Sequence, residues 1–252
     1  MNELLLKSSA LDYDVIAFAE TWLTSDHLTT ELFDCNLYTV FRKDRSAELT
    51  GFQRGGGVLL AVKNTYSTKL QILPTPASSF DIDQLVVKIT FNHNFNILVA
   101  VSYIPPNSSL EIYRCHLSNC SYFLDTLKEN THFLFVGDFN LGHIKWQFNN
   151  INHLPFHVNT DTDSLLLDFL SINNLSQINN ICNSNGRILD LALIDNELIS
   201  EITVPLSPLF ENSYHHEPFY IEMKVIDYQD SSTCKILNEF MLSFDWNEIL
   251  SN

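Results

Sequence analysis

Short apolar segments separated by polar turns are the feature of this sequence that most restricts its fold. Each is four to seven residues long, a length typical of β-strands in a packed core. One of them, 85–91, also alternates apolar and polar residues, as a half-buried strand does. The predicted strands are 15–19, 57–62, 85–91, 97–103, 133–136, 189–194 and 219–225.

Two longer segments repeat apolar residues at helical spacing instead. They are 110–127, with Ser108 or Ser109 as its N-cap, and 163–172. Few helices among many hairpin-like strands predict an α/β (α+β) fold, in which two packed β-sheets are flanked by helices.

The composition of the chain changes after residue 225. A length of 252 residues with 45% hydrophobic and 17% charged residues suits one large domain, or one domain with a tail, and argues against disorder. The segment 227–235 is polar and aperiodic, and 237–250 regains helical spacing. We therefore expect one domain over residues 1–225, followed by a linker and helical tail over residues 226–252.

Cysteine usage and hydropathy indicate the compartment. The five cysteines are scattered, odd in number and without a Cys-x-x-Cys pair, which argues against disulfides and a zinc site. No apolar run reaches the roughly 18 residues that a membrane span needs. The N-terminus also lacks the basic start and apolar stretch of a secretion signal. We expect an intracellular protein, nuclear or cytoplasmic, that is neither secreted nor bound to a membrane.

The formal net charge of −16 argues against binding to nucleic acid. Affinity for a polyanion usually comes from Lys and Arg side chains that neutralise phosphates. A metal-centred site partly escapes this objection, because a bound cation inverts the charge of the acidic residues around it.

The segment GDFN, at 137–140, places a carboxylate and a carboxamide just after a predicted strand. Residues i and i+2 of an extended segment face the same side, so Asp138 and Asn140 can point at one substrate. Hydrolysis of a phosphodiester needs a carboxylate that handles a water proton and a neutral donor for the phosphate. An ordinary Asx turn after a buried strand explains the segment equally well.

Two further carboxylates follow or interrupt apolar segments. Glu20 comes directly after the strand 15–19; it either marks the strand end or binds Mg²⁺, which prefers oxygen ligands. Asp190 lies among leucines, where a carboxylate needs a partner unless it faces solvent on an edge strand. His215 or His216 could be that partner, since a carboxylate fixes the tautomer of a histidine.

Tyr103 begins the segment YIPP, whose prolines restrict the chain as it leaves a strand. Its hydroxyl group could donate to a phosphate, and a tyrosine that only fills an interface is equally consistent. The glycine run 55–57 lacks the pattern of a phosphate-binding loop and leads into a strand. We interpret it as a turn.

The order of these segments resembles a known superfamily. It runs ETW, RGGGVLLAVK, YIPP, GDFN followed by Trp146, LDLAL, and a histidine close to a proline. This order resembles the endonuclease/exonuclease/phosphatase superfamily, and more narrowly the endonuclease domain of non-LTR (LINE-type) retrotransposons. The resemblance covers roughly 11–225. The tail, with FDWNEIL, is similar to the linker that joins that endonuclease to a reverse transcriptase.

The resemblance implies a four-layered α/β sandwich of two mixed sheets with the active site at one end. It also implies residue roles. Glu20 would hold the metal ion, Mg²⁺ or alternatively Mn²⁺. Tyr103 and Trp146 would contact the substrate near the phosphate.

The remaining roles that the resemblance implies concern water and charge. Asp138 would position or deprotonate the attacking water, and Asn140 would steady the phosphate. Asp190 would orient the histidine, which would stabilise the charge on the pentacovalent phosphorus. The implied substrate is DNA, and a reverse transcriptase domain would accompany this one in a full-length element.

The sequence departs from the family pattern in two places. Members normally open with a strand that carries an asparagine near the metal, and Asn2 does not stand in a matching context. We therefore expect the first strand to be absent, which would leave an exposed sheet edge beside 15–19. In addition, His215 replaces the acidic residue that commonly precedes the histidine. His216 fits the His-x-Pro spacing best, and a Tyr-His context would favour His215.

Three functions follow from this resemblance. The first is an active endonuclease that nicks DNA. The second is a catalytically impaired remnant of such a domain. The third is another activity of the superfamily, such as a phosphatase, against which the ETW and GDFN contexts argue.

Overall fold

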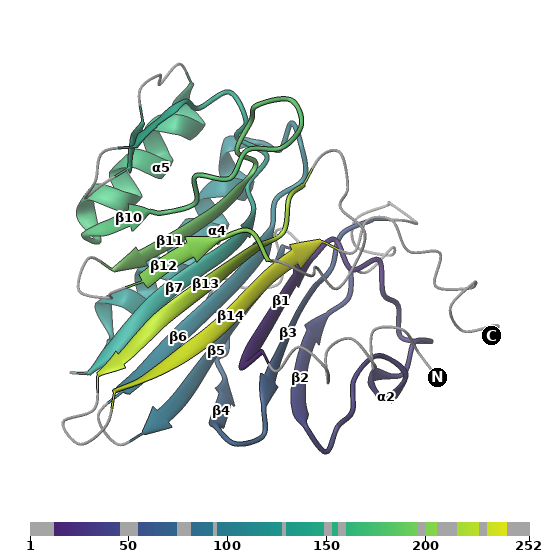
Figure 1. Cartoon of the computed structure of the whole chain (residues 1–252). Helices are drawn as coiled ribbons and strands as arrows, with labels where there is room; N and C mark the ends of the chain where they lie inside the picture. Colours follow the sequence, from purple (N-terminus) through teal and green to yellow (C-terminus); the bar gives the residue numbers. More distant parts are fainter. Residues whose placement is uncertain are drawn as a thin grey trace.

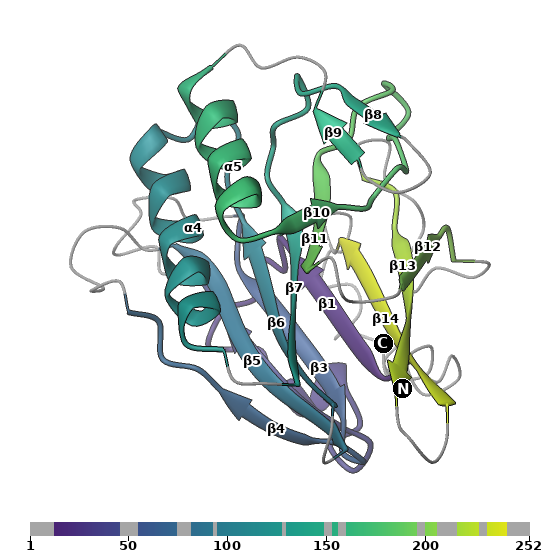
Figure 2. The same ribbon diagram turned by 90° about the vertical axis from the view of Figure 1, so that its left-hand side faces the viewer.

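Two β-sheets lie face to face in the computed structural model, with helices on their outer sides (Figures 1 and 2). This is the predicted α/β sandwich. The structure describes residues 13–45, 55–74, 82–92, 95–127, 130–148, 153–155, 160–195, 200–205, 216–226 and 231–240.

The six-stranded sheet has the order β12-β13-β14-β1-β3-β2. β14 is parallel to β1, and the other neighbouring strands are antiparallel. Its strands are β1 (Val15–Ala19), β2 (Tyr38–Lys43), β3 (Val58–Lys63), β12 (Ser200–Thr203), β13 (Phe219–Ile226) and β14 (Ser231–Phe240).

The eight-stranded sheet has the order β4-β5-β6-β7-β11-β10-β9-β8. Only β6 and β7 are parallel among its described pairs, and parallel neighbours need a crossover, which the helix between them supplies. Its strands are β4 (Ser67–Leu70), β5 (Asp83–Asn92), β6 (Phe95–Tyr103), β7 (Thr131–Asp138), β8 (Trp146–Phe148), β9 (His153–Pro155), β10 (Leu175–Gln177) and β11 (Asp190–Asp195).

Helices α4 (Leu110–Asp125) and α5 (Asp161–Ile172) lie side by side on the outer face of the eight-stranded sheet (Figure 2). The predicted helices are confirmed, and Ser109 is the N-cap residue of α4. Thr160 caps α5, because its hydroxyl oxygen accepts a hydrogen bond from the backbone of Asp163. The short helix α2 (Thr29–Leu32) packs against the other sheet.

Alternation along β1 shows how the sequence builds the layers. Val15, Ala17 and Ala19 belong to the apolar core between the two sheets. Ile16 and Phe18 point the other way, toward α2. A third apolar core lies between the eight-stranded sheet and helices α4 and α5. These three cores separate four layers, as predicted.

All seven predicted strands are present, within two residues of the expected bounds where they differ. The prediction for 226–252 is wrong where the structure describes it. Ser231–Phe240 form strand β14, not a polar linker and the start of a helix. Cys234 and Ile236 are buried while Lys235 is exposed, so the segment does alternate.

The expected exposed edge beside β1 is therefore also wrong. β14 pairs along the whole of β1, from Val15 opposite Ile236 to Ala19 opposite Phe240. β3 occupies the other side of β1. Backbone hydrogen bonding satisfies both sides of this strand, which is central to its sheet.

Among the described residues, no helix combines the length and the apolar character needed to cross a lipid bilayer.

Candidate active site

Four polar side chains form a row across adjacent strands of the eight-stranded sheet. The register pairs Asp83 of β5 with Tyr103 of β6. It then pairs Tyr103 with Asp138 of β7, and Asp138 with Asp190 of β11. Residues directly opposite each other project to the same face of a sheet. Tyr103 belongs to the core between the sheets, so the row faces the other sheet.

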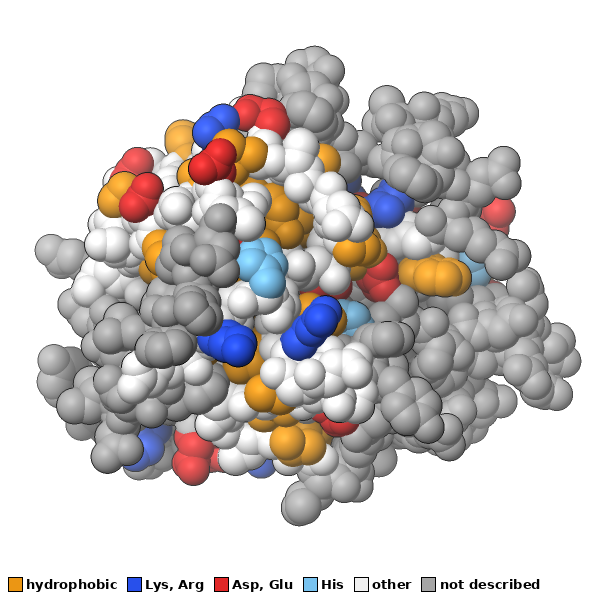
Figure 3. Space-filling model, turned by 90° about the horizontal axis from the view of Figure 1, so that it is seen from above, with side chains coloured by type: hydrophobic (Ala, Val, Ile, Leu, Met, Phe, Trp, Pro, Cys, Tyr) orange, Lys and Arg blue, Asp and Glu red, His pale blue; other side chains and the backbone are white. Residues whose placement is uncertain are grey.

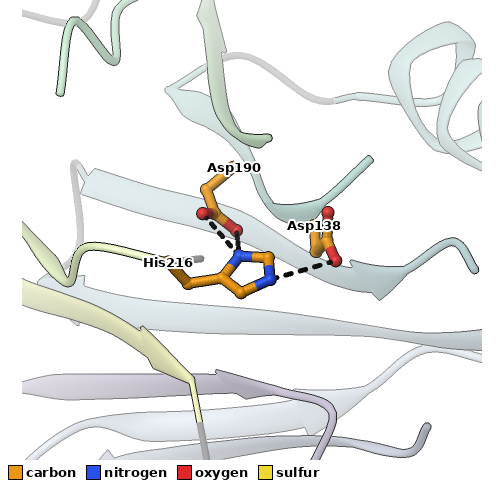
Figure 4. A group of neighbouring side chains, drawn as sticks. All are labelled: Asp138, Asp190 and His216. Atoms are coloured by element: carbon orange, nitrogen blue, oxygen red, sulfur yellow. Dashed lines mark hydrogen bonds and ion pairs between the residues drawn. The ribbon is translucent and has the colours of Figure 1, made fainter. Parts of the chain in front are cut away.

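The six-stranded sheet contributes Glu20 and His216 from the opposite side. Glu20 follows the last residue of β1, and His216 lies just before β13. The imidazole Nδ1 of His216 is 2.9 Å from Oδ2 of Asp190, and its Nε2 is 3.9 Å from Oδ2 of Asp138 (Figure 4). The structure thus brings together side chains of β6, β7 and β11 with residues next to β1 and β13.

Glu20 lies in a strained loop. Its φ angle is 52°, and Trp22 has a φ angle of 53°, a left-handed conformation that costs a non-glycine residue about 1–2 kcal/mol. The backbone N–H groups of Thr21 and Trp22 donate to the carbonyl oxygens of Gly57 and Gly56, which holds the loop in this conformation. Strain of this kind clusters at functional sites.

The GDFN turn holds both oxygens of the Asp138 carboxylate. The backbone N–H of Asn140 donates to Oδ1 at 2.8 Å, and its side-chain Nδ2 donates to Oδ2 at 2.6 Å. The same Nδ2 donates to the carbonyl oxygen of Ile104 at 3.0 Å. The Asx turn is therefore present, and it fixes Asp138 beside His216. Asn140 positions Asp138 in this structure.

Burial and mutual repulsion raise the pKa values of the acidic side chains. Desolvation is the main reason that the pKa of Asp138 is well above its ordinary value, and the charges of Asp190 and Glu20 add to it. Burial likewise raises the pKa of Glu20, although a hydrogen bond from Tyr103 opposes the shift. Burial also raises the pKa of Asp190, against the effect of His216. Neighbouring carboxylates thus destabilise the charged forms of Asp138 and Glu20, so the site favours a cation.

His216 is the cation within the described part of this cluster. Burial alone would lower its pKa, but the charges of Asp190, Asp138 and Glu20 and the hydrogen bond with Asp190 raise the pKa to about 9. The imidazole is therefore protonated at neutral pH. An imidazolium next to two carboxylates can donate a hydrogen bond or a proton to a bound oxygen atom.

The residues at this site fit a divalent cation. Asp138 and Asp190 offer carboxylate oxygens, and their ligand atoms and a ring nitrogen of His216 lie within 4.8 Å of one another. The imidazole itself would bind a cation only in its neutral form. Glu20 interacts electrostatically with both Asp138 and Asp190. A hard ion such as Mg²⁺ prefers carboxylate oxygens, and three neighbouring carboxylates repel one another less when such an ion is bound.

Arg45 and Asp83 lie beside the site and were not predicted from the sequence. Nε of Arg45 donates to Oδ2 of Asp83 at 2.9 Å, and its guanidinium lies 5.2 Å from the centre of the Tyr103 ring. Gly56 leaves room for this side chain, because a Cβ there would lie 2.2 Å from Cζ of Arg45. The glycine run leads into β3, as predicted, but it forms no turn itself, and its carbonyl groups accept hydrogen bonds from Thr21 and Trp22. It also accommodates Arg45. A single ion pair between distant residues leaves no local sequence pattern.

The remaining predicted residues lie as follows. Tyr103 is buried and hydrogen-bonded to Glu20, and burial together with that carboxylate raises its pKa far above the ordinary value. Trp146 is nearly buried at the start of β8, and no described residue accepts a hydrogen bond from its indole N–H. His215 lies outside the described residues, so the choice between the two histidines is open, whereas His216 is in the cluster.

The fold and this site together define a class of hydrolase, one with a buried carboxylate and histidine cluster at the end of two packed sheets. The chain belongs to the endonuclease/exonuclease/phosphatase family, whose model matches residues 2–208. This family is hydrolytic and acts on phosphodiester and phosphate ester bonds. No curated protein matches the sequence significantly.

Several solved structures are similar to this one. An endonuclease/exonuclease/phosphatase from Beutenbergia cavernae has a TM-score of 0.50 at 12% identity, with 87% of this chain and 64% of that chain covered. The endonuclease domain of TRAS1, a telomere-specific non-LTR retrotransposon, has a TM-score of 0.49 at 13% identity over 76% of each chain. ANGEL2, a 2′,3′-cyclic phosphatase, has a TM-score of 0.48 at 13% identity, covering 90% and 77%. The first of these supports the same fold.

Proposed function

We propose that this protein is a Mg²⁺-dependent endonuclease that nicks DNA, from a non-LTR retrotransposon whose full-length product also carries a reverse transcriptase. The observation that carries the proposal is the convergence of Glu20, Asp138, Asp190 and His216 at one end of the two sheets. The sequence resemblance at ETW, GGGVLLAVK and GDFN supports DNA as the substrate.

Asp138 is the proposed base that orients and deprotonates the attacking water. Both oxygens of its carboxylate are held by Asn140, so its direction is fixed before substrate binds. Burial raises the pKa of Asp138, which brings the carboxylate closer to the pH at which a general base is most effective.

His216 is the proposed donor to the phosphate. Asp190 accepts a hydrogen bond from Nδ1, which leaves Nε2–H on the side of Asp138, where the reacting phosphate would lie. A pKa of about 9 keeps the imidazole charged at neutral pH, so it can stabilise the negative charge that develops on phosphate oxygens.

Glu20 is the proposed metal ligand, and Tyr103 fixes its carboxylate by a hydrogen bond. When bound, Mg²⁺ would polarise the phosphate and lower the pKa of water. Mn²⁺ offers the same coordination chemistry and is the alternative cofactor.

The test is nicking of supercoiled plasmid by the purified chain with Mg²⁺, Mn²⁺ or EDTA. We expect D138N and H216Q to slow nicking by roughly 10²- to 10⁴-fold, the usual contribution of one acid–base group. D168N is the matched control, because Asp168 is exposed on α5. Nicking by D138N at the wild-type rate, or nicking that survives EDTA, would contradict the mechanism.

The nicking assay, together with an assay of phosphate release, distinguishes the two other functions. A well-folded wild-type chain that nicks no plasmid under any metal would indicate a catalytically impaired remnant. Release of inorganic phosphate from a monoester, faster than nicking and equally dependent on Asp138, would indicate a phosphatase of the same family.

A further inference from the structure

A groove of about 910 Å³ begins at the catalytic end of the molecule. Two segments form most of it: 142–146, which follows the GDFN turn, and the loop 182–189 before β11, of which all but one residue line the groove. Asn140 lines the same groove and holds Asp138 by two hydrogen bonds. A molecule lying in the groove would therefore contact the residue that positions the Asp138 carboxylate.

The charge of this groove is opposite to that of the whole chain. Its lining includes Lys145 and Arg187, and none of its lining residues is acidic. The chain as a whole has 14 basic and 30 acidic residues. The groove thus presents two basic side chains on an acidic protein, while Asp138 and Asp163 lie behind its lining residues Asn140 and His143. Exposed basic side chains attract anionic ligands.

The two basic side chains are available to a ligand. Lys145 and Arg187 are both exposed, and neither forms an ion pair with any residue that the structure describes. Most other described arginines differ in this respect: Arg42, Arg45 and Arg114 each pair with a carboxylate. Figure 3 shows basic side chains near a histidine on the face seen from above.

The floor of the groove is closely packed. A Cβ at Gly142 would lie 2.5 Å from Cδ2 of Leu189 and 3.2 Å from Cδ of Arg187. Glycine therefore lets the two segments approach, which brings Lys145 and Arg187 to one groove. Trp146 also lines it, with an indole N–H that no described residue accepts.

We propose that this groove binds the DNA backbone next to the scissile phosphodiester, with Lys145 and Arg187 contacting the flanking phosphates. The inference rests on the proposed nuclease function and adds to it the surface that holds the substrate. Contacts to phosphate supply affinity and register without reading sequence. They also bear on the objection of net charge, because they place two basic side chains where the strand would lie.

The experiment measures binding of a fluorescein-labelled duplex by anisotropy between 50 and 200 mM salt. Log affinity falls with log salt, and each lost phosphate contact lowers the magnitude of this negative slope by about 0.9. For K145Q/R187Q, we therefore expect a slope smaller in magnitude by roughly 1.8. The loss of affinity over this fourfold range of salt should then be about tenfold smaller than for the wild type. K69Q/K224Q changes the net charge equally at exposed lysines outside the groove and should leave the slope unchanged.

A second readout uses bis(p-nitrophenyl) phosphate, a diester without flanking phosphates. The groove variant should hydrolyse it at the wild-type kcat/KM, while its KM for plasmid rises. Equal salt slopes for K145Q/R187Q and K69Q/K224Q would overturn the inference, even if the wild type nicks DNA. Slower hydrolysis of the small diester would also overturn it, because the two residues would then serve the reaction itself.

The two proposals fail in different ways. If the groove variant loses DNA affinity while the wild type never nicks, the groove inference stands and the nuclease function does not. If a short anionic ligand such as inorganic pyrophosphate competes fully with the duplex, the groove binds a small phosphate compound and the DNA assignment is wrong.

Discussion

Substitution of Gly56 by alanine should destabilise the protein through Arg45. Gly56 has a φ angle of +76°, and its Cβ would lie 2.2 Å from Cζ of Arg45. The left-handed conformation costs alanine about 1–2 kcal/mol. Displacement of Arg45 would also leave Asp83, which is only 2% exposed, without its partner. Breaking a buried pair costs about 3–5 kcal/mol.

Gly186 provides a matched control for this prediction. Its φ angle is +69°, and a Cβ there would meet nothing within 4 Å. G186A should therefore lower the free energy of unfolding only by the conformational cost of about 1–2 kcal/mol, whereas G56A should lower it by about 4–7 kcal/mol in total. Urea denaturation followed by circular dichroism measures both losses, with unchanged m-values if the two states stay the same.

A double-mutant cycle isolates the role of the ion pair. In the background R45A/D83N, G56A should cost no more than G186A, because there is no guanidinium to displace and no buried charge to expose. The reasoning would be refuted if G56A and G186A lost the same free energy in the wild type. It would also be refuted if the extra loss persisted in the R45A/D83N background.

Three further predictions concern other features. Burial lowers the pKa of His116 to about 3, against about 6.5 in the unfolded chain. The free energy of unfolding should therefore fall as the pH falls below 6.5, by up to about 4 kcal/mol at pH 3. H116Q should flatten this dependence in urea titrations. G137A should lower the free energy of unfolding by about 3 kcal/mol or more and slow nicking, because its Cβ would lie 1.9 Å from the carbonyl oxygen of Ser102. Thermal unfolding measures this loss of stability. Mg²⁺ at 100 times its Kd should stabilise the wild type by about 2.7 kcal/mol, EDTA should reverse this, and E20Q should abolish it in thermal-shift assays.

Most of the strands that the sequence predicted are buried on both faces. β1, β3 and β7 are apolar along most of their length, because each packs between two layers. β14 was missed because its composition is mostly polar; two of its side chains, Cys234 and Ile236, enter the core, and its place also depends on backbone hydrogen bonds to β1 and β13. A sequence pattern does not report such a distant pairing.

The sequence predicted the candidate site only when its residues were considered together. Each residue alone allowed another interpretation. Glu20 alone is consistent with a strand end, and GDFN alone with an Asx turn, which the structure does contain. Their order along the chain carried the information. The ion pair of Arg45 with Asp83 and the groove of Lys145 with Arg187 depend on contacts between distant segments, so local patterns do not reveal them.

The total charge of the sequence does not report the charge of each part of the surface. A value of −16 averages over the whole surface, whereas a ligand responds to the charges within about one Debye length, roughly 10 Å at ordinary salt. The lining of the groove includes two basic residues and no acidic ones, a distribution that the composition does not show.

The place of β14 has a consequence for how the chain acquires its structure during synthesis. The backbone N–H of Lys235 donates to the carboxylate of Asp14, across 221 residues of chain. Contacts of such long range form slowly, and here β14 must emerge from the ribosome before β1 can pair with it. Until then β1 offers an unpaired side to other nascent chains, so a chaperone that shields this strand should raise the yield of folded protein.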